Sequence, residues 1–325
     1  MIARRLGWVA LGGLVLLLPR LVYEGLALDI LTWALFATAL DILLGYTGLL
    51  SFGHAAFFGA GAYASGLLAL RGSVPYPVNA VAGALVAGAL SVPLLYLAVR
   101  RRGIYFAMIT LAFAQMIYYI INEWRGLTGG ENGVQGVPRV LVGGLDLSNL
   151  TMFYYVTVPL VAVGMWVCWR IVHSPFGRVL MAIRENEVRA RSLGYPVDRY
   201  KLLSAVLSCT LSGFAGGIYV IAHRFVALET VHWITSGTVV MMVLLGGMET
   251  TLGPAVGAAL VLLLRDILST WTDAWGVATG AIFVAVILVF RRGIVGTLQQ
   301  LMQSRLHAAL ESAPRRPDEA TPVSR

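Results

Sequence analysis

The segment 173–201, HSPFGRVLMAIRENEVRARSLGYPVDRYK, is a polar, arginine-rich stretch in a chain that is otherwise dominated by apolar residues. Its guanidinium and carboxylate groups could form charge-assisted hydrogen bonds with another protein. Ser174 and Pro175 suit the start of a helix, helix-forming residues continue to Arg191, and Gly194 suits its end. The sequence therefore predicts one short helix followed by a glycine turn.

The residues after this turn predict a second helix. Pro196 cannot continue the first helix, and Asp198 can cap the next one, which enters an apolar stretch at Leu202. An alternative interpretation is a solvated loop whose arginines only fix the orientation of the chain. A helix with a glycine turn does not by itself distinguish the two.

Composition places the chain among membrane proteins. Of its 325 residues, 58% are hydrophobic and 12% are charged, against about 25% charged in a soluble domain. The formal net charge is +8, and Lys201 is the only lysine among 24 basic residues. These residues flank apolar stretches and do not interleave with aromatic residues, which favours membrane topology over binding of nucleic acid.

Ten apolar stretches predict an all-α, polytopic membrane helix bundle of about ten transmembrane helices. The glycine-rich third stretch carries Ser51 and His54, and the eighth is short, so either could be a broken or re-entrant helix. The first resembles a secretory signal without a cleavage site, and we expect it to stay as a span. The stretches are 6–23, 26–44, 48–70, 78–99, 103–121, 152–172, 202–222, 231–247, 252–268 and 274–290.

Basic clusters predict the orientation of these helices. With ten spans, four clusters lie on one side, which the positive-inside bias makes the cytoplasmic side. Both termini are then cytoplasmic, and the loop 122–151 faces outward. We expect a permease domain at 1–292 and a tail at 293–325, amphipathic at first and then disordered. The clusters are Arg4–Arg5, Arg100–Arg102, Arg178–Lys201 and Arg291–Arg316.

Two segments are weakly similar to each other. LLGYTGLLSFGHAAFFGAGAY (43–63) and LLGGMETTLGPAVGAAL (244–260) share a double leucine, two glycines around a polar patch, and a helix of small residues. Transporters often contain internal repeats with interrupted helices at matching places. Chance similarity between two glycine-rich membrane helices is the alternative.

Motifs for catalysis are missing from the sequence. There is no G-x-x-x-x-G-K-[ST] to cradle ATP phosphates, no H-E-x-x-H and no G-x-S-x-G. Cys168 and Cys209 lie in apolar stretches without metal-ligand spacing and are expected to be small buried side chains. We therefore expect a protein that is not itself an enzyme.

Several motifs together resemble a known family. AIRENEVRARSLGYPVDRYKLL resembles the cytoplasmic coupling loop of ABC importer permeases. With LLGYTGLLSFGHAAFFGAGAYAS, RRGIYFAMITLAFAQMIYYI, LTGGENGVQGVP and GGMETTLGPAVGAAL, it is similar to the longer permease subunit of branched-chain amino acid ABC transporters. The match covers about residues 30–292 in collinear order.

This resemblance implies a bacterial inner-membrane permease for branched-chain or related hydrophobic amino acids, working by alternating access. Its implied partners are a second homologous permease, two cytoplasmic ATPase subunits and a periplasmic binding protein. ATP and magnesium would belong to the ATPases, so no cofactor is expected on this chain. The residues expected to couple to the ATPases are Arg184, Glu185, Asn186, Glu187, Arg191, Leu193 and Gly194.

Two further groups of residues are candidates. Glu131, Asn132 and Gln135 of the outer loop could dock the binding protein or form an outer gate, and an ordinary solvated loop is the alternative. The second group is a candidate translocation path and consists of Thr47, Ser51, His54, Thr110 and Gln115. For His54, packing inside the bundle is favoured over contact with substrate.

Two positions depart from the family pattern and leave the substrate open. Asp41 stands where Asn is usual, and Glu249 stands where a small residue is usual. One alternative is an ABC permease of the same class for urea or short amides. A secondary transporter driven by an ion gradient and a membrane-embedded enzyme are more distant alternatives.

Overall fold

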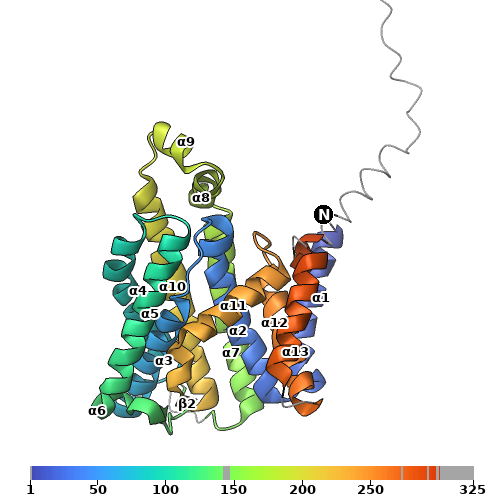
Figure 1. The fold of residues 1–325 in the computed structure, drawn as a ribbon. Helices are drawn as coiled ribbons and strands as arrows, with labels where there is room; N and C mark the ends of the chain where they lie inside the picture. Colours follow the sequence, from blue (N-terminus) through green and yellow to red (C-terminus); the bar gives the residue numbers. More distant parts are fainter. Residues whose placement is uncertain (1, 142–146, 272–273, 291–292, 298–299, 301–325) are drawn as a thin grey trace, which may run out of the picture.

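The structure is a computed structural model, and it describes residues 2–141, 147–271, 274–290, 293–297 and 300. It is an all-α helix bundle, which confirms the predicted fold class (Figure 1). Each of the ten predicted spans overlaps one helix. These helices are α1 (Ile2–Leu21), α2 (Glu24–Asp41), α3 (His54–Arg71), α4 (Val78–Ala98), α5 (Ile104–Glu123), α7 (Leu150–Val172), α10 (Val197–His223), α11 (Trp233–Gly246), α12 (Gly253–Trp271) and α13 (Trp275–Val289).

Six helices are long and apolar enough to cross a membrane. They are α2 with the π-helical turn that follows it (Ile42–Tyr46), α4, α5, α7, α10 and α12. Shorter apolar helices lie at Gly12–Leu21, Trp233–Gly246 and Gly276–Val286. The chain is therefore a multi-pass membrane protein. Beyond 293–297 and 300, the predicted amphipathic and disordered tail lies outside the described residues.

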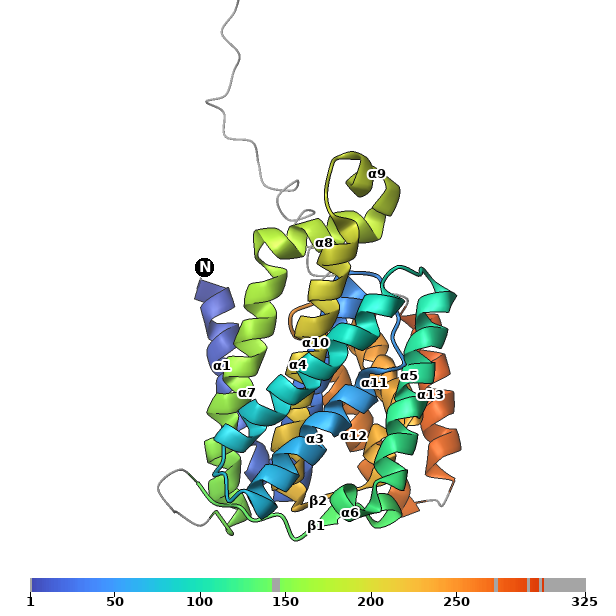
Figure 2. The ribbon, with the colours of Figure 1, turned by 90° about the vertical axis from the view of Figure 1, so that its left-hand side faces the viewer.

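The two ends of the bundle differ in what connects the helices. At one end, α8 (Pro175–Glu185) and α9 (Glu187–Ser192) project past the other helices (Figure 1). The turn at Arg100–Arg102 and the start of α1 lie at this same end, here called the basic end (Figure 2). The elements of the opposite end are α6 (Arg125–Thr128), η2 (Gly130–Asn132), β1 (Val134–Gln135), β2 (Phe225–Val226) and η3 (Leu228–Val231).

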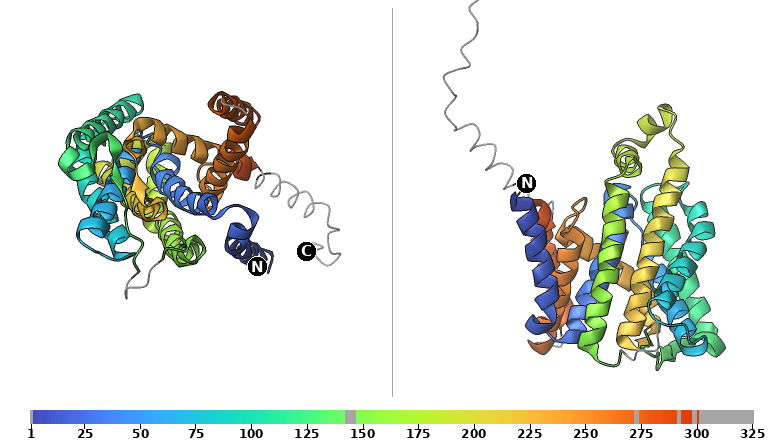
Figure 3. Two further views of the ribbon diagram at one scale, coloured as in Figure 1. Left: turned by 90° about the horizontal axis from the view of Figure 1, so that it is seen from below. Right: turned by 180° about the vertical axis from the view of Figure 1, so that it is seen from behind.

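The helices form two halves, α1–α5 and then α7 with α10–α13. Corresponding helices of the two halves run through the bundle in opposite directions (Figures 1 and 2). In each half a long helix, α2 or α10, is followed by an irregular segment, 47–53 or 224–232, and then by α3 or α11. Packing follows the same relation, because α4 lies along α10 and α12 lies along α2. Seen from below, α4 and α5 lie on one side of α2 and α10, and α13 lies on the other (Figure 3).

This relation differs from the sequence similarity between 43–63 and 244–260. When the helices of the two halves are matched in sequence order, segment 43–63 corresponds to the end of α10 and the start of α11. The segment 244–260 instead covers the turn between α11 and α12. The two segments lie beside each other, since the Tyr46 hydroxyl donates to the Glu249 carbonyl over 3.1 Å. The inverted arrangement is typical of transporters.

The predicted interruption of the 48–70 span is confirmed, because residues 47–53 are not helical and α3 begins only at His54. Open backbone is tolerated at membrane depth only where protein groups satisfy it. Here the Phe52 amide donates to the Thr110 hydroxyl over 3.2 Å, and the Ala55 amide donates to the Ser236 hydroxyl over 2.8 Å. These side chains therefore replace the missing helical hydrogen bonds.

The eighth predicted span is also incomplete as a helix. α11 has 14 residues, and at 1.5 Å per residue it covers roughly 21 Å of the roughly 30 Å of hydrocarbon. The segment before it, with η3, packs along α3 and α5. Both halves thus contain a segment that enters the bundle before a shorter helix begins.

Small residues allow α3, α4 and α10 to pack closely. A Cβ at Gly217 of α10 would lie 2.8 Å from the Ala80 Cα of α4, closer than side chains pack. A Cβ at Gly61 of α3 would likewise meet the Gly213 backbone of α10. Glycine at these positions lets backbones approach and gain dispersion contacts in lipid. α10 also contacts the irregular segment 47–53, because the Ser204 hydroxyl lies 3.0 Å from that of Thr47.

Candidate functional site

Ser174 and Asn186 shape the connection between α7 and α10 at the basic end. The Ser174 hydroxyl accepts from the Gly177 amide over 3.4 Å, and Pro175 begins α8, as predicted. The prediction of a single helix is wrong, because Asn186 adopts an extended conformation (φ −156°, ψ 96°) that ends α8. Its side chain then caps α9, accepting from the Arg189 amide over 2.9 Å.

The glycine turn after α9 is confirmed. α9 ends at Ser192, and Gly194 has φ +88° in open surroundings, so glycine is needed there for the backbone conformation rather than for space. The predicted cap of the next helix is wrong. Pro196 precedes α10, and Asp198 lies in its first turn, where it pairs with Arg191 over 3.1 Å.

Glu187 ties α9 to the bundle. Its carboxylate lies 2.6 Å from the Lys201 ammonium on α10, 2.9 Å from Arg102 and 3.2 Å from Arg191. Partial burial alone would raise the pKa of Glu187. The hydrogen bond from Lys201 and the charges of Lys201 and Arg102 outweigh this effect, so the pKa lies below its ordinary value.

Arg184 ties α8 to the bundle. One guanidinium nitrogen donates both to the Gly45 carbonyl, in the π-helical turn after α2, and to the Glu249 carboxylate, in the turn between α11 and α12. Ile183 packs beside it in a small cluster with Ala190 and Val197. The α8–α9 unit is therefore fixed to the bundle at two separate places.

The seven residues expected to couple to ATPases have three kinds of position: in contact with the bundle, at bends of the backbone, or exposed to solvent. Arg184 and Glu187 point into the contacts just described, while Asn186 and Gly194 shape the backbone. Arg191 stays 52% exposed while it pairs with Glu187 and Asp198. Glu185 and Leu193 face solvent, and Leu193 is 72% exposed.

Sequence reasoning missed two exposed residues of this unit. Val188 is 63% exposed and Tyr195 is 40% exposed. A signal for both was present, since large apolar side chains are rare in a solvated loop and, with Leu193, they bracket the glycine turn. Together the outward residues form what we call the projecting surface, consisting of Glu185, Val188, Arg189, Leu193 and Tyr195.

Four of the five residues assigned to a translocation path lie together around segment 47–53. The Thr47 and Ser204 hydroxyls are 3.0 Å apart, and the His54 ring lies 2.9 Å from the Ser51 hydroxyl and 2.8 Å from that of Ser208. These residues, with Thr110, are buried. Ser204 and Ser208 are one helical turn apart on α10, so the segment descends along α10 by roughly 6 Å.

Both ring nitrogens of His54 lie within hydrogen-bond distance of serine hydroxyls, and its packing role stays a prediction. Thr110 is also occupied, since it donates to the Ala107 carbonyl over 2.9 Å. Gln115 differs from the others. It is half-buried on α5, and the described residues offer its amide no hydrogen bond.

The three outer-loop candidates lie at the opposite end. Glu131, Asn132 and Gln135 are exposed, on η2 and β1, and β1 pairs with β2 through Val134 and Val226. This end is held by Arg139, whose Nε donates to the Ile221 carbonyl near the end of α10 over 2.9 Å. The candidates therefore sit on a well-supported surface opposite to α8 and α9.

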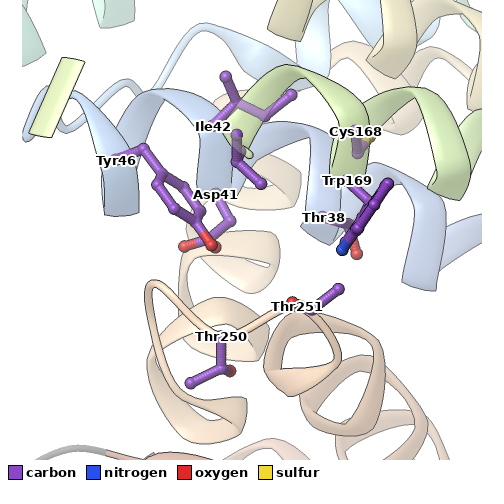
Figure 4. A pocket seen from close by; sticks show the side chains of 9 residues that line it. Thr38, Asp41, Ile42, Tyr46, Cys168, Trp169, Thr250 and Thr251 are labelled. Carbon is purple, nitrogen blue, oxygen red and sulfur yellow. The ribbon is translucent and has the colours of Figure 1, made fainter. Parts of the chain in front are cut away.

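A small crevice lies beside the turn between α11 and α12 (Figure 4). Asp41, Tyr46 and Trp169 line it together with Thr250 and Thr251. Its free volume is about 10 Å³, near the lower limit for one water molecule. The crevice is therefore too small to hold an amino acid.

A many-spanning bundle with interrupted helices, an inverted repeat and a helical unit that projects beyond one end defines a transport permease. The family profile for the branched-chain amino acid transport system permease component matches residues 22–290. The chain belongs to this family, which is a family of transport subunits. The resemblance noted from the motifs is thereby confirmed.

Curated relatives agree with this assignment. The chain is 27% identical over 304 residues to the high-affinity branched-chain amino acid transport permease LivM of Salmonella typhimurium, covering 85% of this chain and 71% of the relative. It is 26% identical over 321 residues to LivM of Escherichia coli, covering 90% and 75%. A probable branched-chain amino acid permease LivH of Methanocaldococcus jannaschii is 24% identical over 300 residues, covering 85% and 92%. No solved structure matches the chain.

Proposed function

We propose that this chain is one of two membrane subunits of an ABC importer for branched-chain or related hydrophobic amino acids. A second, homologous permease completes the path, two ATPases bind at the basic end, and a periplasmic binding protein delivers substrate to the opposite end. Relatives named LivM and LivH support a pair of related permeases. ATP and magnesium belong to the ATPases.

The observation that carries this proposal is the α8–α9 unit. It projects beyond the bundle (Figure 1) and presents three large apolar side chains, Val188, Leu193 and Tyr195, to solvent. Exposed apolar side chains rimmed by charged groups are typical of protein interfaces. Because the unit is fixed at Arg184 and Glu187, movement of a bound ATPase would be passed to the helices rather than absorbed by a loose loop.

The orientation follows from the distribution of arginine. The basic end carries Arg100–Arg102 and the basic residues of α8 and α9, so it faces the cytoplasm. Cysteine labelling in intact cells tests this placement, with Cys168 and Cys209 replaced by Ala. A cysteine substituted for Asn132 should react with an impermeant maleimide from outside, and one substituted for Ser192 should not. The reverse pattern would contradict the orientation.

Co-purification tests the interface. The chain should be expressed with the second permease and the ATPases, and V188D and L193D should reduce the ATPase recovered with it. V140D is the matched control, since Val140 is 40% exposed at the opposite end. ATPase recovery unchanged in V188D and L193D, or no ATPase with the native chain, would contradict the proposal.

Uptake into proteoliposomes tests the cargo. Leucine, isoleucine and valine should be taken up in a manner that requires ATP and the binding protein. Uptake of urea or short amides instead would keep the class of transporter and change the substrate. Uptake that an ionophore abolishes and that does not need ATP would favour a transporter driven by an ion gradient.

A further inference from the structure

Arg184 makes contacts that an ATPase-binding residue would not need. It lies near the end of α8, one residue before the break at Asn186, yet its guanidinium turns back to the Gly45 carbonyl and the Glu249 carboxylate. Its side chain is only 30% exposed. The residue therefore connects α8 to the membrane helices instead of extending the projecting surface.

The surface beneath Arg184 is shaped to receive it. Gly48 has φ +76°, and a Cβ there would lie 2.8 Å from the Arg184 Cγ. Gly45 offers its carbonyl from the π-helical turn that ends α2, where the helical hydrogen-bond pattern is interrupted. Gly48 thus leaves room for the arginine stem beside the end of α2, and Gly45 lets the Asp41 carboxylate approach the same turn.

Glu249 is held in position from the other side. The Glu249 backbone has φ +62°. Its amide donates to the Asp41 carboxylate over 3.4 Å, and its carbonyl accepts from the Tyr46 hydroxyl over 3.1 Å. The turn between α11 and α12 is therefore fastened to the end of α2. The two residues that depart from the family pattern, Asp41 and Glu249, meet at this point.

The Arg184–Glu249 pair is not well placed to stabilise the fold. The Glu249 side chain is 45% exposed, and ion pairs so accessible to water contribute little to stability. Its position is more informative, because it joins α8 to α2 of the first half and to α11 and α12 of the second half. A displacement of α8 would reach both halves through this one pair.

Resting on the proposed function, we infer that Arg184 and Glu249 form a positioning pair that transmits movement of α8 to the ends of α2, α11 and α12. Without the pair, the ATPases still bind the projecting surface and hydrolyse ATP. The ends of α2, α11 and α12 then no longer follow α8, while α9 stays tied to α10 through Glu187 and Lys201. The pair thereby sets how much substrate is moved for each ATP rather than whether ATP is used.

The test is the ratio of amino acid uptake to ATP hydrolysed by the complete importer in proteoliposomes. R184A and E249A should still co-purify with the ATPases and support ATP hydrolysis. Each should lower the ratio by at least about fivefold, which is the smallest factor by which two coupled sites usually affect each other. The double variant R184A/E249A should be no worse than R184A. The exchanged pair R184E/E249R should recover part of the ratio, which a purely structural role of either residue would not produce.

R178A is the matched control. It removes the same charge from an exposed position on α8, and it should leave the ratio unchanged. An unchanged ratio in R184A or E249A, or an exchanged pair no better than R184A, would overturn the inference. If R184A does not fold, the ratio measured for E249A, whose substituted side chain is half-exposed, tests the inference alone.

Failure of this inference can be told apart from failure of the proposed function. Loss of the ATPase from R184A would place Arg184 in the docking surface, overturning the inference and leaving the importer assignment intact. Absence of any ATPase with the native chain would overturn the importer assignment itself.

Discussion

The Lys201 ammonium lies 2.6 Å from the Glu187 carboxylate, at a place that leaves 3% of the lysine side chain exposed. Lys201 is on the first two turns of α10, and Glu187 begins α9, so the pair closes the glycine turn between the two helices. The lysine is the only one in the chain. A buried cation without its partner would be costly, so the pair fixes α9 against α10.

Lys201→Ala should therefore loosen α9. Removing one partner of a charged hydrogen bond should cost about 1.5–3 kcal/mol, lowering the thermal unfolding midpoint and the hydrogen-exchange protection of α9. R199A is the control, because Arg199 is exposed and the described residues offer its guanidinium no partner. Equal protection of α9 in K201A and the native protein would show that this pair is not needed.

Glu187 should make stability depend on pH. Its native pKa is depressed, so the ionised carboxylate adds stability that is complete above its ordinary value of 4.5. This contribution is lost as pH falls from there through the lower native pKa. E187Q should flatten the acid side of a plot of thermal midpoint against pH. E185Q, which changes an exposed carboxylate two residues earlier, should follow the native curve.

Gly194 should be sensitive to any side chain. A β-branched residue in the left-handed region costs about 1–2 kcal/mol, and Gly194→Pro also removes the hydrogen bond from the Gly194 amide to the Arg191 carbonyl, 3.0 Å long. We expect G194V and G194P to insert into the membrane but to lose ATPase recovery and uptake. G136V is the control, since Gly136 has φ +72° in open surroundings at the opposite end. Normal uptake by G194P would contradict the prediction.

The sequence predicted the elements that depend on neighbouring residues. The ten helices follow from apolar length, the start of α8 from Ser174 and Pro175, and the turn after α9 from Gly194. The break at Asn186 was missed because a single asparagine costs a helix only a few tenths of a kcal/mol, so the residue type alone does not mark a break. Its extended conformation becomes favourable only when the side chain caps α9 and Glu187 can reach Lys201.

Contacts between distant residues could not be predicted from spacing. Arg184 and Glu249 are 65 positions apart, and nothing in their local sequence identifies them as partners. Thr47 and His54 were selected as polar groups within a span, which does not distinguish a transport path from support for open backbone. The structure shows hydrogen bonds for both, whereas the role of Gln115 stays a prediction.

Asp41→Asn should be tolerated. The Asp41 carboxylate accepts from the Glu249 amide over 3.4 Å, and an asparagine carbonyl oxygen can accept the same hydrogen bond without a buried charge. Thermal stability and uptake per ATP should stay close to those of the native protein. D41A is the comparison and should lower both, because it leaves the Glu249 amide without its acceptor. A large loss in D41N would show that the charge itself is required.

His54→Ala should separate packing from contact with substrate. Removing the ring leaves a cavity and takes a partner from both Ser51 and Ser208, a combined cost of about 2–4 kcal/mol. If His54 only supports segment 47–53, the thermal midpoint falls while the KM for amino acid uptake by the folded protein stays unchanged. Gln115→Ala is the counterpart, since its amide has no hydrogen bond among the described residues and its loss should leave the midpoint unchanged. A raised KM in Q115A with a normal KM in H54A would place the path along α5, and the opposite result would place it along segment 47–53.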